Sequence, residues 1–143
     1  MKIDYSKADY LHRTDDPEGR FTGLPLRVSY SDGRTWVVLR NVSYRTLAGP
    51  ISTVRVGFAF DFASIPRLFW RLTPPAGKGY GLAAVWHDWL YAHHEIAGKP
   101  IVRRQADDLF LEIMRYAGVS AWMARTMWLA VRSAGWWSWG KEK

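Results

Sequence analysis

The hydrophobic pattern of this sequence changes its period once, near residue 60, and that change decides the class of fold. Before it, residues 24–30, 35–42 and 53–58 are short runs rich in β-branched and aromatic residues. The first two flank Asp32-Gly33, a pair that suits a tight hairpin turn. After residue 60, apolar residues recur at helical spacing. We therefore expect an α+β fold, a small N-terminal antiparallel sheet followed by a three-helix C-terminal half.

The helical half is bounded by residues that start and stop helices. Ser120 can cap the third helix with its hydroxyl, and Gly118 and Gly98 are suited to ending the helices before them. We expect helices at residues 82–94, 102–116 and 121–133, followed by the tail Trp136-Trp137-Ser138-Trp139.

The length of the chain predicts one domain. Compact domains most often contain roughly 100–150 residues, and this chain contains 143. A second core would leave neither core well buried. We expect a single domain over residues 1–143, made of a polar arm (1–23), a β half (24–60) and a helical half (82–135).

Composition excludes some chemistry and leaves the partner open. The chain has no cysteine, so it has no disulfide, no thiolate metal site and no cysteine nucleophile. Its net charge of +7 is scattered along the chain and favours a polyanion, which includes nucleic acid, teichoic acid and an anionic membrane. It shows neither a signal peptide nor a membrane-spanning run, so we expect synthesis in the cytoplasm.

A cluster of polar residues on the first two predicted helices is the candidate site. His87 and Tyr91 are four residues apart and share a helix face, while Asp88 lies about 100° around the axis. On the second helix, Asp107 lies beside the apolar stripe and Asp108 turns away from it. If the helices pack together, Asp107 can accept a hydrogen bond from one ring nitrogen of His87 and leave the other nitrogen to take a proton from water.

The same residues also fit a structural interpretation. A His-Asp pair among aromatic residues can be a satisfied buried network that fixes the register of two helices. Asp61 is either a metal ligand or a loop residue, and Ser64 is better explained as a turn hydroxyl before Pro66 than as a nucleophile. These alternatives stay open at the level of sequence.

Three motifs resemble those of an uncharacterised family found in bacteriophages and prophages, DUF1353. They are G-F-A-F-D-F-A-S-I-P-R at 57–67, H-D-W-L-Y at 87–91 and R-Q-A-D-D at 104–108. The resemblance spans about residues 55–135 and implies a phage context rather than a reaction. A role in the virion, in the tail or in lysis would agree with it.

A shorter resemblance concerns mechanism. The segments A-A-V-W-H-D-W-L-Y at 83–91 and A-D-D-L-F at 106–110 are similar to the core of secreted-type phospholipases A2, especially the parvoviral capsid version. This resemblance implies that His87 is the general base, Asp88 a calcium ligand, Asp107 the partner that orients the imidazole, and Tyr91 a supporting hydroxyl.

The sequence departs from that pattern at the calcium loop. Gly77, Gly79 and Gly81 lie close to His87, in an order that differs from the loop of those enzymes. Further oxygen ligands would have to come from this glycine loop or from Asp61. A zinc site that uses His87, Asp61 and either Asp107 or Asp88 is the alternative.

Our leading hypothesis is a phage-encoded, metal-dependent hydrolase of the bacterial envelope, with calcium or zinc as cofactor. His87 and Asp107 would activate water against peptidoglycan or a phospholipid ester. The alternative is a non-catalytic tail, baseplate or assembly protein that binds other virion proteins and has a structural His-Asp network. Either protein is made in the host cytoplasm and then joins the virion or reaches the envelope.

Two further expectations concern partners. Nucleic acid is disfavoured, because the second helix begins with Arg103-Arg104 but continues with Asp107, Asp108 and Glu112. The tryptophan-rich tail favours peripheral contact with a membrane surface. The residues expected to make it are Trp136, Trp137 and Trp139.

Overall fold

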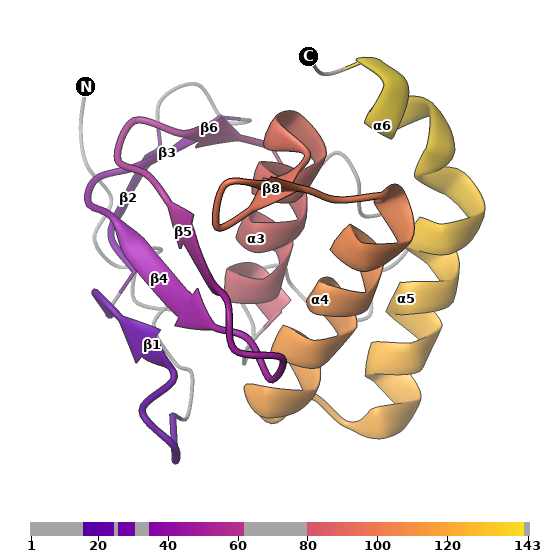
Figure 1. Ribbon diagram of the computed structural model, residues 1–143, viewed down its shortest axis with the longest axis horizontal. Helices are drawn as coiled ribbons and strands as arrows, with labels where there is room; N and C mark the ends of the chain where they lie inside the picture. The colour runs from indigo at the N-terminus through magenta and orange to yellow at the C-terminus, as the bar shows by residue number, and fades with distance from the viewer. Residues whose placement is uncertain (1–15, 25, 31–34, 62–79, 142–143) are drawn as a thin grey trace.

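The strands come first in the chain and the helices follow, which confirms the predicted α+β class (Figure 1). The computed structural model describes residues 16–24, 26–30, 35–61 and 80–141. Ser64, Gly77 and Gly79 lie outside the described residues, as do the first fifteen residues of the expected polar arm.

In the described residues of the N-terminal half, six short strands form two antiparallel sheets. One sheet has the order β1-β4-β5 and the other the order β2-β3-β6. Their bounds are β1 Phe21–Thr22, β2 Val28–Tyr30, β3 Trp36–Val38, β4 Val42–Arg45, β5 Ile51–Val54 and β6 Ala59–Phe60. The predicted hairpin is confirmed by the pairing of β2 with β3, in which Val28 lies opposite Val38; its turn, residues 31–34, is outside the described part of the chain.

The other strand predictions need correction. The run 53–58 is not one strand, because Gly57 adopts a φ of +90° and turns the chain between β5 and β6. The run 35–42 is likewise divided between β3 and β4. One long strand and two short strands joined by a turn can show the same alternation of polar and apolar residues. The alternation therefore does not show where a strand ends within such a run. Phe21, assigned to the irregular arm, is buried and belongs to β1, which pairs with β4.

The three predicted helices are present, with ends that differ by at most two residues. They are α3 (Tyr80–His93), α4 (Arg103–Tyr116) and α5 (Ala121–Ala134). Ser120 caps α5 as predicted, accepting a hydrogen bond from the Met123 amide at 3.3 Å. Within the described residues, no helix is long and apolar enough to cross a membrane.

Two elements of the C-terminal half were not predicted. A small hairpin, β7 (Glu95–Ile96) with β8 (Lys99–Pro100), joins α3 to α4 and turns through Ala97 and Gly98, both at positive φ. The tryptophan tail, for which no secondary structure was predicted, forms a short helix, α6 (Trp136–Lys141).

Helix α3 is the central element of the core. In Figure 1 it lies between the sheets on one side and α4 and α5 on the other. Its Trp86 is fully buried against Phe21 and Tyr44, and the indole Nε1 donates to Ser52 Oγ at 3.0 Å. The strands and helices thus share one contiguous hydrophobic cluster.

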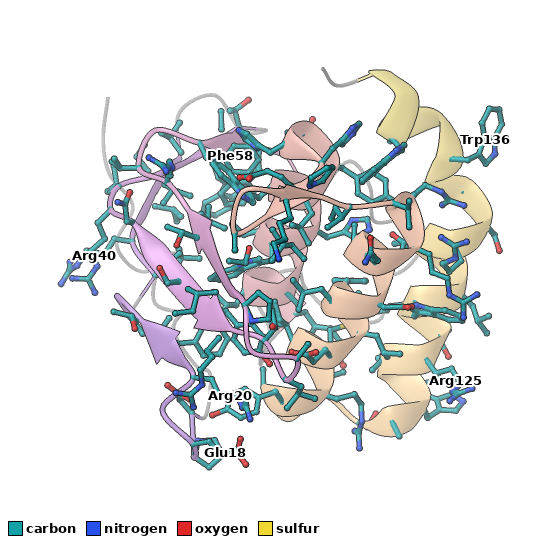
Figure 2. All side chains as sticks on the ribbon, in the orientation of Figure 1. Glu18, Arg20, Arg40, Phe58, Arg125 and Trp136 are labelled. Atoms are coloured by element: carbon teal, nitrogen blue, oxygen red, sulfur yellow. The ribbon has the colours of Figure 1, made fainter. Side chains whose placement is uncertain are left out.

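Closer to the end of α3, Phe58 covers the helix from the sheet side. Figure 2 shows its side chain between the sheet and α3. Its ring meets Trp89 edge-on, with the centroids 5.1 Å apart. The sheet therefore contacts α3 over several turns, which fixes the helix that carries the candidate site.

We expect Trp86→Phe to lower the free energy of unfolding by about 1–3 kcal/mol, because it removes buried volume and leaves the Ser52 hydroxyl without its donor. Urea unfolding at neutral pH measures this effect. The matched control is Trp122→Phe at an exposed position, for which we expect a change within about 0.5 kcal/mol. Equal effects of the two substitutions would contradict the central place of Trp86.

Candidate functional site

Asp107 is the centre of the candidate site. Its carboxylate is fully buried, and side chains from α3, α4 and α5 donate hydrogen bonds to it. His87 Nε2 and Tyr91 Oη bind Oδ1 at 2.7 and 2.6 Å. Arg132 Nη1 and Arg103 Nη1 bind Oδ2 at 2.8 and 3.4 Å. The predicted contact between His87 and Asp107 is confirmed.

Helical spacing explains how these groups meet. His87 and Tyr91 are one turn apart on α3, and Arg103 and Asp107 are one turn apart on α4, so each pair shares a face. The imidazole is held by aromatic rings on two sides. Its centroid lies 4.2 Å from that of Tyr91 and 4.8 Å from that of Phe110. The ring of His87 is therefore fixed in place by packing as well as by its hydrogen bond.

The surrounding donors keep Asp107 ionised. Burial by itself raises the pKa of this carboxyl, but hydrogen bonds from His87, Tyr91 and Arg132 outweigh burial and hold the pKa below its ordinary value of 3.8. Burial raises the pKa of Tyr91, and the bond to Asp107 raises it further, so the phenol keeps its proton and donates. The site thus contains a buried negative charge with four donors.

The hydrogen bond to Asp107 selects the tautomer of His87. In a neutral imidazole only one nitrogen carries a proton, and donation to the carboxylate places it on Nε2. Any proton that His87 accepts therefore goes to Nδ1. The side chain of His87 has 0% of its surface exposed, so in the described part of the molecule this oriented base lies in the interior.

The hydrogen bonds of Asp107 argue against its use as a metal ligand, and the other proposed ligands stay candidates. Both oxygens of Asp107 are already bound by donors, two of them guanidinium groups, so Asp107 does not fit a zinc site. Asp88 is half-buried beside His87, and Asp61 is exposed at the end of β6. Gly81, expected in a carbonyl-donating loop, lies in α3. Among the described residues, no three His, Asp or Glu side chains gather as a metal-binding group.

Sequence reasoning missed the two arginines. Arg103 could have been found from its spacing of four residues to Asp107, a favourable pair on a helix. Arg132 comes 25 residues after Asp107, and nothing local to it signals the contact. Arg103 also donates to the backbone carbonyls of Val131 and Arg132 at 3.3 and 3.2 Å, so it ties the last turn of α5 to α4.

The C-terminal segment packs against the site. Trp139 is half-buried and meets Tyr91 edge-on at 5.2 Å, and it stacks on His94 at 3.7 Å. Of the tail residues expected at a membrane, Trp139 therefore faces inward, whereas Trp136 is exposed. The side chain of Trp137 is outside the described atoms.

Gly135, at the junction of α5 and α6, allows this close approach. A methyl group at this position would overlap the Tyr91 hydroxyl and the Val131 carbonyl oxygen, and it would lie 3.2 Å from Arg103 Nη1. Tyr91 is itself buried and hydrogen-bonded, so it has little room to move. The glycine is therefore required by packing against the site.

We expect Asp107→Asn to lower the free energy of unfolding at pH 7 by about 3–5 kcal/mol, because it removes the only negative charge in a buried network of donors. An ionised carboxylate with a lowered pKa contributes its full stability above pH 3.8 and loses it as the pH falls through the folded-state pKa. The difference from the wild type should therefore shrink below that pH in urea unfolding measured from pH 7 to acid.

The control for this series is Asp108→Asn, at an exposed carboxylate that binds Trp128 and Arg104. Its effect should stay below about 1 kcal/mol. A pH-independent loss in Asp107→Asn would show that the charge of Asp107 is not what stabilises the fold.

We expect Gly135→Ala to destabilise the protein by about 1–3 kcal/mol through overlap with the Tyr91 hydroxyl and the Val131 carbonyl oxygen. Adding Tyr91→Phe removes that hydroxyl, so the double variant should lose at least about 0.5 kcal/mol less than the sum of the single losses. Thermal or urea unfolding of the four proteins gives the coupling. Gly140→Ala, in α6 with open space around it, is the neutral control, and additive effects would contradict the packing argument.

Comparison with known proteins identifies a family. A family model described as "Protein of unknown function (DUF1353)" matches residues 36–131, which include His87, Tyr91 and Asp107. No curated protein and no solved structure matches the chain significantly. The match covers more than half of the sequence. The chain therefore belongs to the DUF1353 family of proteins of unknown function.

Proposed function

We propose that this protein is a hydrolase of the bacterial envelope in which His87 is the general base. The observation that supports it is the 2.7 Å bond from His87 Nε2 to an ionised, buried Asp107. That bond orients the ring and directs proton transfer to Nδ1. Fixed geometry of this kind is what an efficient general base requires.

The chemistry follows from those positions. Water gives a proton to Nδ1 of His87 as its oxygen attacks a carbonyl carbon, and the C–O or C–N bond to the leaving group then breaks. The proton passes from the imidazolium to the leaving oxygen or nitrogen. Asp107 stabilises the imidazolium, and Tyr91 holds the carboxylate in place through its 2.6 Å bond.

The substrate proposal draws on the resemblances. The contacts of His87 and Tyr91 with Asp107 agree with the roles implied by the likeness to phospholipases A2. That likeness favours a phospholipid ester, and the resemblance to phage proteins adds peptidoglycan and a path to the envelope or the virion. We retain Asp88 as the proposed ligand of a divalent cation, which would polarise the carbonyl oxygen when bound.

A second function is favoured by a specific observation. His87 and Asp107 are fully buried, and two guanidinium groups already neutralise Asp107. A satisfied interior network of this kind serves equally well to lock three helices together. Under this proposal the protein is a non-catalytic component of a phage tail or baseplate, or an assembly factor, and acts through its surface.

His87→Gln separates the two functions. The glutamine amide can donate to Asp107 in place of Nε2, but it has no basic nitrogen in place of Nδ1. For a general base we expect a loss of about 10²–10⁴-fold in kcat, with the fold retained. The assays are fatty acid release from phospholipid vesicles and release of soluble fragments from peptidoglycan.

The matched control is His93→Gln, at an exposed histidine on the same helix, which should keep full activity. Activity that survives His87→Gln would reject the catalytic proposal. A wild type inactive on both substrates, with His87→Gln changing stability alone, would favour the structural protein. Chelation followed by addition of calcium or zinc, compared in wild type and Asp88→Asn, tests the proposed metal.

A further inference from the structure

The outer face of α5 and α6 exposes a row of large apolar side chains with an arginine among them. Trp122, Leu129 and Trp136 are 70%, 52% and 69% exposed, and Arg125 is exposed between the first two. Figure 2 shows Arg125 and Trp136 projecting from the outer side of these helices, away from the sheets. We call these four residues the tryptophan stripe.

The stripe follows from the helix period. Trp122, Arg125 and Leu129 are three and four residues apart on α5, so they share one face. The opposite face, with Ala124, Met127 and Val131, is buried. The bonds from Gly135 N to Val131 O and from Trp139 N to Gly135 O carry the helical path into α6. At 1.5 Å per residue the stripe is roughly 20 Å long.

The charged side chains on α5 and α6 themselves have one sign, although Arg132 is paired with Asp107. Residues 121–141 contain Arg125, Arg132 and Lys141 and no acidic residue. Among the described residues, Arg125 makes no ion pair. A face that combines indole rings, a leucine and unneutralised arginine complements an interface of apolar chains and anionic headgroups.

A second copy of the chain fits this face less well. In a two-fold symmetric contact the same patch meets itself, which would bring Arg125 close to its own equivalent. Like charges at an interface oppose association. An anionic lipid surface instead attracts the arginine and accepts the indole rings at the headgroup level.

We propose that the tryptophan stripe binds the surface of anionic lipid bilayers, with α5 lying along the membrane plane. This inference names a partner for the proposed envelope function. It rests on the exposed side chains and their charge, and it does not require chemistry at His87.

Flotation of the full chain with lipid vesicles tests the proposal. We expect at least tenfold stronger binding to phosphatidylcholine vesicles with about a third phosphatidylglycerol than to pure phosphatidylcholine, and weaker binding at about 0.5 M NaCl. The double variant Trp122→Ser with Trp136→Ser should bind at least tenfold less, and Arg125→Glu about tenfold less. Far-ultraviolet circular dichroism checks that each variant is folded.

The controls are Arg55→Glu and Leu47→Ser, which change an exposed arginine and an exposed leucine on the sheet side of the molecule. Both should bind within about twofold of the wild type. Absence of vesicle binding, or stripe variants that bind like the wild type, would overturn the proposal. So would a concentration-dependent dimer in sedimentation that the stripe variants abolish.

Two arms separate this inference from the proposed hydrolase. His87→Gln should keep full vesicle binding, and the stripe variants should keep their hydrolysis of a short-chain phosphatidylcholine dispersed as monomers. Vesicle binding by a wild type that hydrolyses nothing would support the stripe and reject the hydrolase. Hydrolysis without vesicle binding would do the reverse.

Discussion

A single buried carboxylate imposes the arrangement of the helical half. Taking the Asp107 charge out of water is costly unless several donors replace the lost hydration. Those donors come from α3 (His87, Tyr91), from α4 itself (Arg103) and from α5 (Arg132). Any other relative position of the three helices would leave the charge short of partners. Apolar packing alone is more tolerant of small shifts, so the charge adds a demand for one specific geometry.

Separate polar contacts join α3 and α4 to the sheets. The buried residues of α3 include no Asp, Glu, Lys or Arg. The indole N–H of Trp86 is satisfied by its hydrogen bond to Ser52 of β5. On α4, Glu112 accepts from the Tyr44 hydroxyl at 2.7 Å and from the Leu47 amide at 3.1 Å. Glu112 thus fixes the side of α4 that faces the sheet. Asp107 fixes the side that faces α3 and α5.

Much of the helical half could be predicted, because helices depend on residues a few positions apart. The contact between His87 and Asp107 joins residues 20 positions apart, and it was expected from the helix face on which each residue lies and from the resemblance to phospholipases A2. The 3.6-residue period located α3, α4 and α5, and it placed Asp107 inward and Asp108 outward. The break at Gly57, the β7-β8 hairpin and the pairing of β1 with β4 depend on turns and on distant strands that local patterns do not encode. Arg132 was missed for the same reason, because its guanidinium group binds a carboxylate on another helix.

The contact between Arg132 and Asp107 has a consequence for folding during synthesis. The ribosome delivers Asp107 before Arg132, which follows 25 residues later, and Gly135 comes later still. Until that stretch has emerged, the carboxylate lacks its closest guanidinium partner, and α4 has only α3 of its two helical neighbours. We therefore expect the interior to close late, after α5 is made, with the nascent chain exposed to proteases and chaperones up to that point.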